Sequence, residues 1–168
     1  MSTGDKDKHL TGLDLPDVPL WAIWAVQSYA TDQGLDRAKA RYGEHMKTWL
    51  SFIIDGKHPH LTVDSNGLVR TDGTKLPMSW MDSTHSDGSA MIPRTGYLVE
   101  FNALWYNALV FLQQMYASDQ DCQGCVERWR ELSDKAKPAF LDTFVSDYGY
   151  LYDYVNGRYT DLSVRPNM

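Results

Sequence analysis

The stretch IPRTGYLVEFNALWYNAL, residues 92–109, decides the fold of this chain. It begins as a loop and continues into a helix predicted from about residue 98 to residue 118. Apolar side chains occupy nearly every side of that helix, and such a helix must be covered on every side by other elements. They are Phe101, Leu104, Trp105, Tyr106, Leu109, Val110, Phe111, Leu112 and Met115.

Three further helices are predicted around this one. Asp17, Pro19 and an apolar run start a helix that Gly34 ends, and this helix too is apolar nearly all round. The helices expected at about 35–54 and 122–145 are apolar on one side and charged on the other. The alternation of buried and amphipathic helices predicts a double-layered helical barrel, because four helices alone would not cover both apolar ones.

The chain reads as one domain preceded by a short tail. Residues 1–16 lack periodicity and are expected to be a flexible lead-in, whereas residues 17–168 are expected to form a partial barrel domain. Asn-Gly turn signals at residues 66–67 and 156–157 predict small β-hairpins. The predicted fold class is therefore all-α, with about two helical hairpins and small β-hairpin insertions.

The composition argues against several classes of partner. A formal net charge of −6 and a pI near 5.2 disfavour nucleic acid and anionic membranes, because both attract a basic surface. No apolar run approaches the ~20 residues that a membrane-spanning helix needs. The opening MSTGDKDKHL is polar and unlike a secretory signal, so we expect a cytoplasmic protein.

Aromatic residues are frequent, with six Trp and ten Tyr in 168 residues. A flat ring with a polar edge suits the mixed CH and OH faces of a sugar, although any single ring is more often a core residue. By contrast, Cys122 and Cys125 form a lone CQGC. Zinc would need a second pair of ligands and a redox pair a βαβ context, so no metal or cofactor is expected.

The loops ahead of the two apolar helices are where chemistry is expected, since inner barrel helices point their N-termini at a common mouth. Glycoside hydrolysis needs two carboxylates across the bond, and one of them gives a proton to the leaving oxygen. Apolar neighbours keep such a donor protonated, and Asp82, close to Trp80, fits this role. The residues expected near the mouth are Asp17, Trp80, Asp82, Arg94, Glu100 and Asn102.

Simpler roles compete for the same carboxylates. Asp82 suits a turn or a cap, and Asp17 suits a plain N-cap. Glu100 lies in apolar surroundings and needs a partner, which could be Arg94 in a structural ion pair or a ligand hydroxyl. The residues by themselves leave these alternatives open.

Four segments carry a resemblance to a known family. DVPLW at residues 17–21 resembles the DAxLW-type start of a barrel helix in the glucosidase domain of glycogen debranching enzymes, and SWMD at 79–82 is similar to its TWMD segment. Residues 92–109 closely match its TPRxGxxVEINALWYNAL pattern. DYVNGRYTDLSVRPNM, residues 153–168, is similar to the segment leading into its SxRPNQ motif. The chain thus resembles part of the C-terminal amylo-α-1,6-glucosidase domain of glycogen debranching enzyme.

This resemblance implies part of an (α/α)6 barrel that releases glucose from α-1,6 branch points of glycogen or branched malto-oligosaccharides by an inverting mechanism. By position, Asp82 would be the general acid. Asp17, Trp80, Arg94, Glu100 and Asn102 would line the glucose pocket, without a metal or organic cofactor. The chain matches about two of six hairpins, and the base that activates water would be expected beyond residue 168.

The expected function is therefore that of a hydrolase segment in glycogen breakdown that is inactive as this isolated chain. One alternative is a non-catalytic glycan-binding or interaction module derived from such a barrel. Another is a different α/α-barrel glycosidase, acting on trehalose or glucosylated oligosaccharides. A partial barrel also leaves helix faces exposed, which predicts association with a second copy or with a missing barrel segment.

Overall fold

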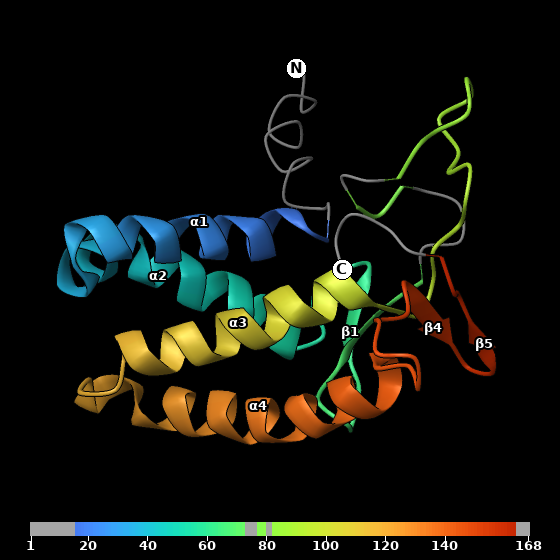
Figure 1. Cartoon of the computed structure of the whole chain (residues 1–168). Coiled ribbons are helices and arrows are strands. Elements are labelled where there is room, and N and C mark those ends of the chain that lie inside the picture. The colour runs from blue at the N-terminus through green and yellow to red at the C-terminus, as the bar shows by residue number, and fades with distance from the viewer. Residues whose placement is uncertain (1–15, 73–76, 80–81, 164–168) are drawn as a thin grey trace, which may run out of the picture.

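Four α-helices form the body of the computed structural model, which describes residues 16–72, 77–79 and 82–163. They are α1 (Val18–Gln33), α2 (Leu35–Ile54), α3 (Val99–Met115) and α4 (Gln123–Phe144), and a 3-10 helix, η2 (Gln120–Cys122), precedes α4. The four helices predicted from the sequence are confirmed. Figure 1 shows two helical hairpins, α1–α2 and α3–α4, packed side by side with α3 in contact with the other three helices.

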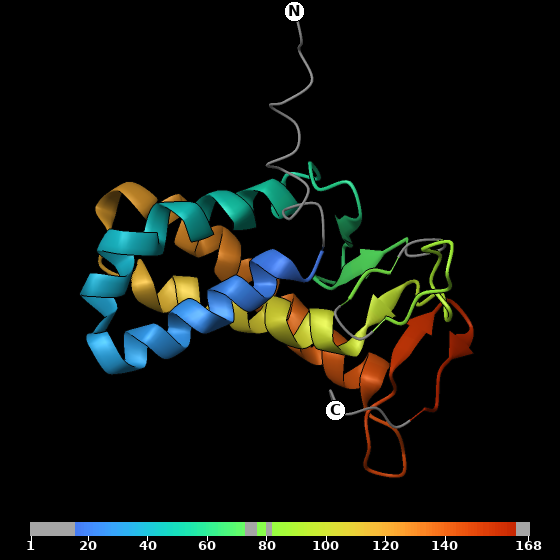
Figure 2. The same cartoon turned by 90° about the horizontal axis from the view of Figure 1, so that it is seen from above.

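The direction of the helices gives the molecule two different ends. α1 and α3 begin at the same end, on the right in Figure 1, and the view from above in Figure 2 agrees. The strands lie at this end, and α2 and α4 run back towards it. Parallel α1 and α3 suit the inner helices of a barrel. The described residues contain two hairpins, so closure into a barrel stays a prediction.

α3 is the buried helix that its sequence predicts. Its apolar side chains, Trp105 and Leu109 among them, are almost completely removed from solvent. The indole N–H of Trp105 donates to the carbonyl oxygen of Gly67 at 2.9 Å. Gly67 has a φ of +84°, and a Cβ there would come within 2.8 Å of the backbone of α4 at Leu132 and Ala136. The turn at Gly67 therefore packs tightly between α3 and α4.

α1 contradicts the expectation that it is covered on every side. Pro19, Leu20 and Ile23 are its buried residues, whereas Trp24 is 49% exposed and Val18 is 38% exposed. The physical reason is that α2 and α3 cover one side of α1, and no other described element lies over the opposite side. An apolar sequence without a second layer of neighbours leaves an exposed apolar helix face.

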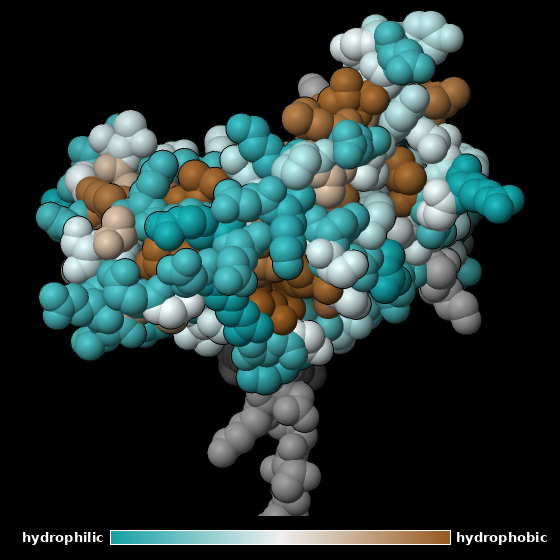
Figure 3. Space-filling view, turned by 90° about the horizontal axis from the view of Figure 1, so that it is seen from below, coloured by the Kyte–Doolittle hydropathy of each residue, from teal (hydrophilic) through white to brown (hydrophobic). Residues whose placement is uncertain are grey.

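The start of α1 also differs from the expected cap. Asp17 occupies the N-cap position, but its side chain makes no capping hydrogen bond. Its φ of −81° and ψ of −26° are helical, whereas a capping residue is usually extended. The amphipathic character of α2 and α4 is confirmed, since each buries one side. Figure 3, seen from below on the side of α4, shows a largely hydrophilic face there.

Two small antiparallel sheets lie at the end where α1 and α3 begin. β1 (Leu61–Val63) pairs with β2 (Val69–Thr71), and β4 (Tyr154–Asn156) pairs with β5 (Tyr159–Thr160), which confirms both predicted hairpins. β3 (Tyr97–Leu98) was not expected. It pairs with β4 and continues directly into α3, so it brings the segment around β4 beside the start of the buried helix.

Candidate functional site

Arg94 is the centre of a buried polar cluster beside the start of α3. Its side chain, which is 2% exposed, reaches from the loop before β3 to Glu100 in the first turn of α3. Nη1 donates to Oε1 of Glu100 at 2.7 Å, and Nη2 donates to Oε2 at 2.8 Å. Two parallel hydrogen bonds of this kind are the strong form of an arginine–carboxylate pair. The ion pair considered for Glu100 from the sequence is therefore confirmed.

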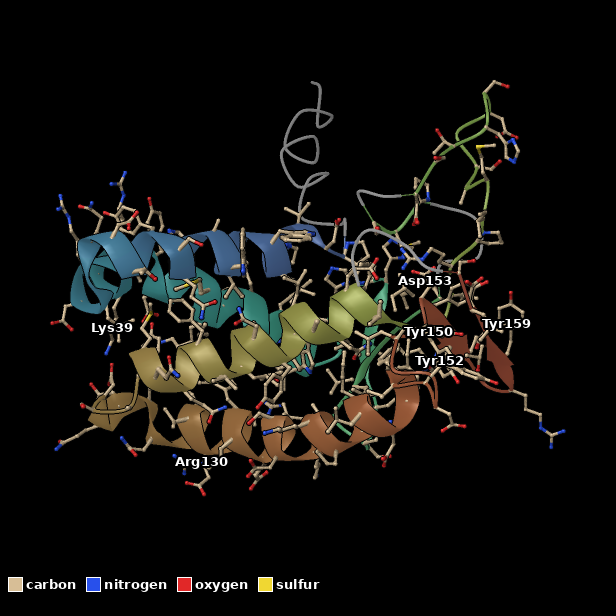
Figure 4. The ribbon with its side chains drawn as sticks, viewed as in Figure 1. Lys39, Arg130, Tyr150, Tyr152, Asp153 and Tyr159 are labelled. Atoms are coloured by element: carbon tan, nitrogen blue, oxygen red, sulfur yellow. The ribbon has the colours of Figure 1, made fainter. Side chains whose placement is uncertain are left out.

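Asp153 is the second carboxylate of the cluster, and it was not among the site residues predicted from the sequence. Nε of Arg94 donates to Oδ2 of Asp153 at 3.1 Å, and Nη2 donates to Oδ1 at 2.7 Å. Asp153 is 0% exposed, and its carbonyl oxygen accepts the N–H of Val99 at the start of α3. Figure 4 places it at the end of the molecule where α3 begins. The sequence offers one signal for Asp153: it alternates with Tyr152 and Tyr154 just before the β4–β5 hairpin.

Asp82 is the third carboxylate, and its two oxygens have different surroundings. Oδ2 accepts the backbone N–H groups of Met78 at 2.7 Å and Ser79 at 3.1 Å. Oδ1 lies 3.5 Å from Nη1 of Arg94, and the Asp82 side chain is 3% exposed. The turn role considered for Asp82 from the sequence is therefore confirmed. It occupies Oδ2, and Oδ1 is the oxygen that faces Arg94.

The charges of the cluster explain why Arg94 stays ionised although it is buried. Burial alone would lower the pKa of Arg94. Hydrogen bonding to Glu100, together with the negative charges of Glu100, Asp153 and Asp82, outweighs burial and raises the pKa above its ordinary value. The guanidinium of Arg94 thus connects the loop at Asp82, the start of α3 at Glu100 and the residue before β4, Asp153.

Asn102 is the fourth residue of α3 and serves the fold directly. It is 0% exposed, and its Oδ1 accepts the N–H of Val69 in β2 at 2.8 Å. Its Nδ2 donates to the carbonyl oxygens of Val69 at 3.0 Å and Leu98 at 2.9 Å. These three contacts tie β2 to the junction of β3 and α3. A contact of Asn102 with substrate stays a prediction.

The structure therefore brings together Asp82, Arg94 and Glu100, with Asn102 nearby. Asp17 is 5% exposed at the start of α1, at the same end of the molecule as the start of α3. Trp80 lies outside the described residues. This arrangement does not test the expectation that Asp82 is the general acid and that the other five residues line the glucose pocket, so both stay predictions.

The two cysteines lie apart from this cluster, beyond the opposite end of α3. Cys122 is buried at the N-cap position of α4, and Cys125 follows in its first turn. Burial, together with a hydrogen bond to Cys125, raises the pKa of the Cys122 thiol to about 12. Within the described ranges, no helix is both long and apolar enough to cross a membrane. No group of three or more His, Cys, Asp or Glu side chains there is placed to hold a metal.

Comparison with known proteins adds one finding to this geometry. The sequence model of a protein family described as amylo-alpha-1,6-glucosidase matches residues 8–168. No curated protein and no protein of solved structure gives a significant match. The match covers all residues of the buried cluster.

Proposed function

The chain belongs to the amylo-alpha-1,6-glucosidase family, and we propose that it is the part of such a glycoside hydrolase that carries the proton donor. The substrate is an α-1,6-linked glucose branch on glycogen or a malto-oligosaccharide, hydrolysed with inversion. The observation that carries the proposal is the position of Asp82. Its buried carboxyl group lies against Arg94, in the cluster beside the start of α3.

Asp82 uses one oxygen for positioning and one for chemistry. Oδ2 is fixed by the N–H groups of Met78 and Ser79, so the proton of a general acid sits on Oδ1. The acid gives this proton to the glycosidic oxygen as the bond to glucose breaks. The two N–H donors and the Arg94 guanidinium then stabilise the carboxylate that remains.

Arg94 is a positioning residue in this mechanism. Its shortest hydrogen bonds go to Glu100 and Asp153, and these hold the guanidinium in place beside Asp82. Glu100 and Asn102 act on the fold in the same way, by fixing the start of α3. Asp17 and Trp80 are assigned to the glucose pocket by the resemblance of their motifs alone.

Neither Glu100 nor Asp153 suits the base that activates water. Glu100 and Asp82 contact the same nitrogen of Arg94, and Asp153 contacts the same guanidinium. An inverting pair needs ~6.5–9.5 Å between its carboxyl groups, with a water molecule between them. Glu100 and Asp153 are also engaged in hydrogen bonds to Arg94 through both of their oxygens. We therefore expect the isolated chain to bind substrate without hydrolysing it.

The same observation favours a second candidate, a non-catalytic glycan-binding module derived from a hydrolase barrel. In such a module Asp82 would only stabilise its own turn, and the cluster would only hold the loops in place. The two candidates differ in what Oδ1 of Asp82 does. An enzyme places Oδ1 at the glycosidic oxygen, so Asp82→Asn changes recognition of the branch, whereas a module of the second kind is indifferent to it.

The test is calorimetric titration with a malto-oligosaccharide that carries one α-1,6-linked glucose, compared with a linear one of equal size. Glucose release is measured in the same samples. We expect tighter binding of the branched ligand, loss of this preference in Asp82→Asn and no glucose release. Asp87→Asn is the matched control, because Asp87 lies in the same loop but is exposed.

Each outcome decides between the candidates. Equal binding of branched and linear ligands would contradict the proposed site. An unchanged branch preference in Asp82→Asn would assign the chain to the non-catalytic class. Glucose release that disappears in Asp82→Asn would keep the proton donor and refute the expected inactivity.

A further inference from the structure

Three tyrosines form a row on the segment that follows α4, with Tyr148 exposed and Tyr150 and Tyr152 half-buried. Tyr148 is 86% exposed, and its ring is nearly parallel to that of Tyr150, with 13° between the planes and 6.3 Å between the centroids. The ring of Tyr152 meets Tyr150 edge-on, with centroids 6.1 Å apart. Figure 4 labels Tyr150 and Tyr152 beside the end of α4. A row of three rings in contact that ends in an exposed tyrosine offers a surface that a flat ligand can cover.

The backbone beneath this row is held in one conformation. The N–H of Ser146 donates to the carbonyl oxygen of Tyr150 at 2.9 Å, and Ser146 Oγ accepts the N–H of Tyr150 at 3.2 Å. The N–H of Tyr152 donates to the carbonyl oxygen of Phe144 at the end of α4 at 2.8 Å. Figure 2 shows this loop projecting from the body of the molecule. A fixed backbone lowers the entropy cost of binding, because the rings need little further ordering.

The tyrosine row and Asp153 of the buried cluster belong to the same segment of the chain. Leu151 packs against a small group of buried apolar residues, Leu68, Val99, Ala136 and Phe144, and Asp153 is bound to Arg94. Tyr148 lies in the turn closed by the hydrogen bond from the N–H of Gly149 to the carbonyl oxygen of Ser146, and Tyr152 directly precedes Asp153. The tyrosine row therefore ends next to a carboxylate of the candidate site in the sequence.

We propose that Tyr148, Tyr150 and Tyr152 form a second glucan-binding surface, which contacts the main chain of the α-glucan outside the catalytic cluster. Tyrosine rings cover the CH faces of pyranoses while their hydroxyl groups remain available to sugar hydroxyls. A neutral glucan is not repelled by a chain with a net charge of −6. The choice of an α-glucan rests on the proposed function, but the surface needs no catalytic residue.

A protein partner is the competing occupant of this surface. Leu141 is 51% exposed and Val145 is 45% exposed near the end of α4, and exposed apolar residues can mark protein contacts. The tip of the loop, however, consists of rings with polar edges, beside the exposed carboxylate of Asp147. That mixture suits a hydroxyl-rich ligand better than an apolar protein surface.

The experiment is native electrophoresis of the full chain in gels that contain increasing glycogen. We expect glycogen to retard the chain, and Tyr148→Ser and Tyr150→Ser each to weaken retention roughly three- to tenfold, the range of one ring contact. Tyr148→Phe keeps the ring and should retain most of the binding. Tyr159→Ser is the control, because Tyr159 is 55% exposed and lies outside the row.

The outcomes separate this surface from the catalytic cluster. The tyrosine variants should weaken retention in glycogen while they leave the branch preference measured by calorimetry unchanged, whereas Asp82→Asn should alter that branch preference. A wild-type chain that glycogen does not retard would overturn the proposal. So would tyrosine variants that migrate like wild type. Variants that change only the sedimentation of the chain would assign the row to a protein contact instead.

Discussion

Asp153→Asn should destabilise the chain much more when Arg94 is present than when Arg94 is replaced. In the wild-type chain the two side chains share hydrogen bonds of 2.7 and 3.1 Å, and both are almost completely buried. Asp153→Asn removes a charge-assisted interaction, and we expect a loss of about 1.5–3 kcal/mol in the free energy of unfolding. In Arg94→Met the guanidinium is absent, so Asp153→Asn should lower the free energy of unfolding much less than it does in wild type.

Arg94→Met alone should be the most damaging substitution in the cluster. It leaves Glu100 and Asp153 without their cation, and removal of one partner from a buried pair costs about 3–5 kcal/mol. Urea unfolding followed by circular dichroism of the helices measures this loss. With an m-value of ~2 kcal/mol per molar urea, the midpoint should fall by about 1.5–2.5 M. Arg94→Lys keeps the charge but not the planar fork, and it should lie between wild type and Arg94→Met.

The double-mutant cycle formed by wild type, the two single variants and the double variant isolates the interaction. If Asp153→Asn lowered stability equally in both backgrounds, the pairing of Asp153 with Arg94 would be refuted. If Arg94→Met does not fold, the same cycle in the Arg94→Lys background gives the test. There the loss caused by Asp153→Asn should be smaller than in wild type, and an undiminished loss would count against the pairing.

Four further predictions follow from other parts of the molecule. Gly67→Ala should lower the free energy of unfolding by about 2–5 kcal/mol, measured in urea, because it combines a left-handed backbone with a close contact to α4. A hydrogen bond from Lys39 lowers the pKa of Asp119 below 3.8, so the ionised carboxylate stabilises the fold above that pH. The difference in stability between wild type and Asp119→Asn should therefore vanish as the pH falls further below 3.8. Because burial raises the pKa of Cys122 to about 12, its alkylation by iodoacetamide should be slow at pH 8 and accelerate as pH approaches 12, measured by mass spectrometry. The exposed apolar face of α1 should cause concentration-dependent association in analytical ultracentrifugation, and Trp24→Lys should weaken it.

Local patterns in the sequence determined the helices and hairpins of this chain. Gly34 has a φ of +90° between α1 and α2, a conformation that glycine permits, so the end of α1 could be predicted from one residue. The charged and apolar sides of α2 and α4 fixed which side of each helix is buried. The 18-residue stretch at 92–109 indicated both the buried helix and the family.

The buried cluster was only partly visible in the sequence. Arg94 and Glu100 are close in sequence, at six residues apart, and apolar surroundings made a partner for Glu100 necessary. Asp153 is 59 residues from Arg94, and nothing local distinguishes it from a turn aspartate. The pairing of β3 with β4 brings it to the start of α3, and such a long-range pairing is not encoded in any short pattern.

The sequence by itself thus determined the four helices, the two turn-closed hairpins and the family, because periodicity, glycine positions and motifs act over short separations. Tertiary structure alone decided which carboxylates share one guanidinium, which oxygen of Asp82 is engaged by its own turn and which side of α1 is exposed. These properties depend on what packs against each residue from distant parts of the chain. An apolar helix is buried only where a neighbour covers it, and a buried charge persists only where another segment supplies its partner.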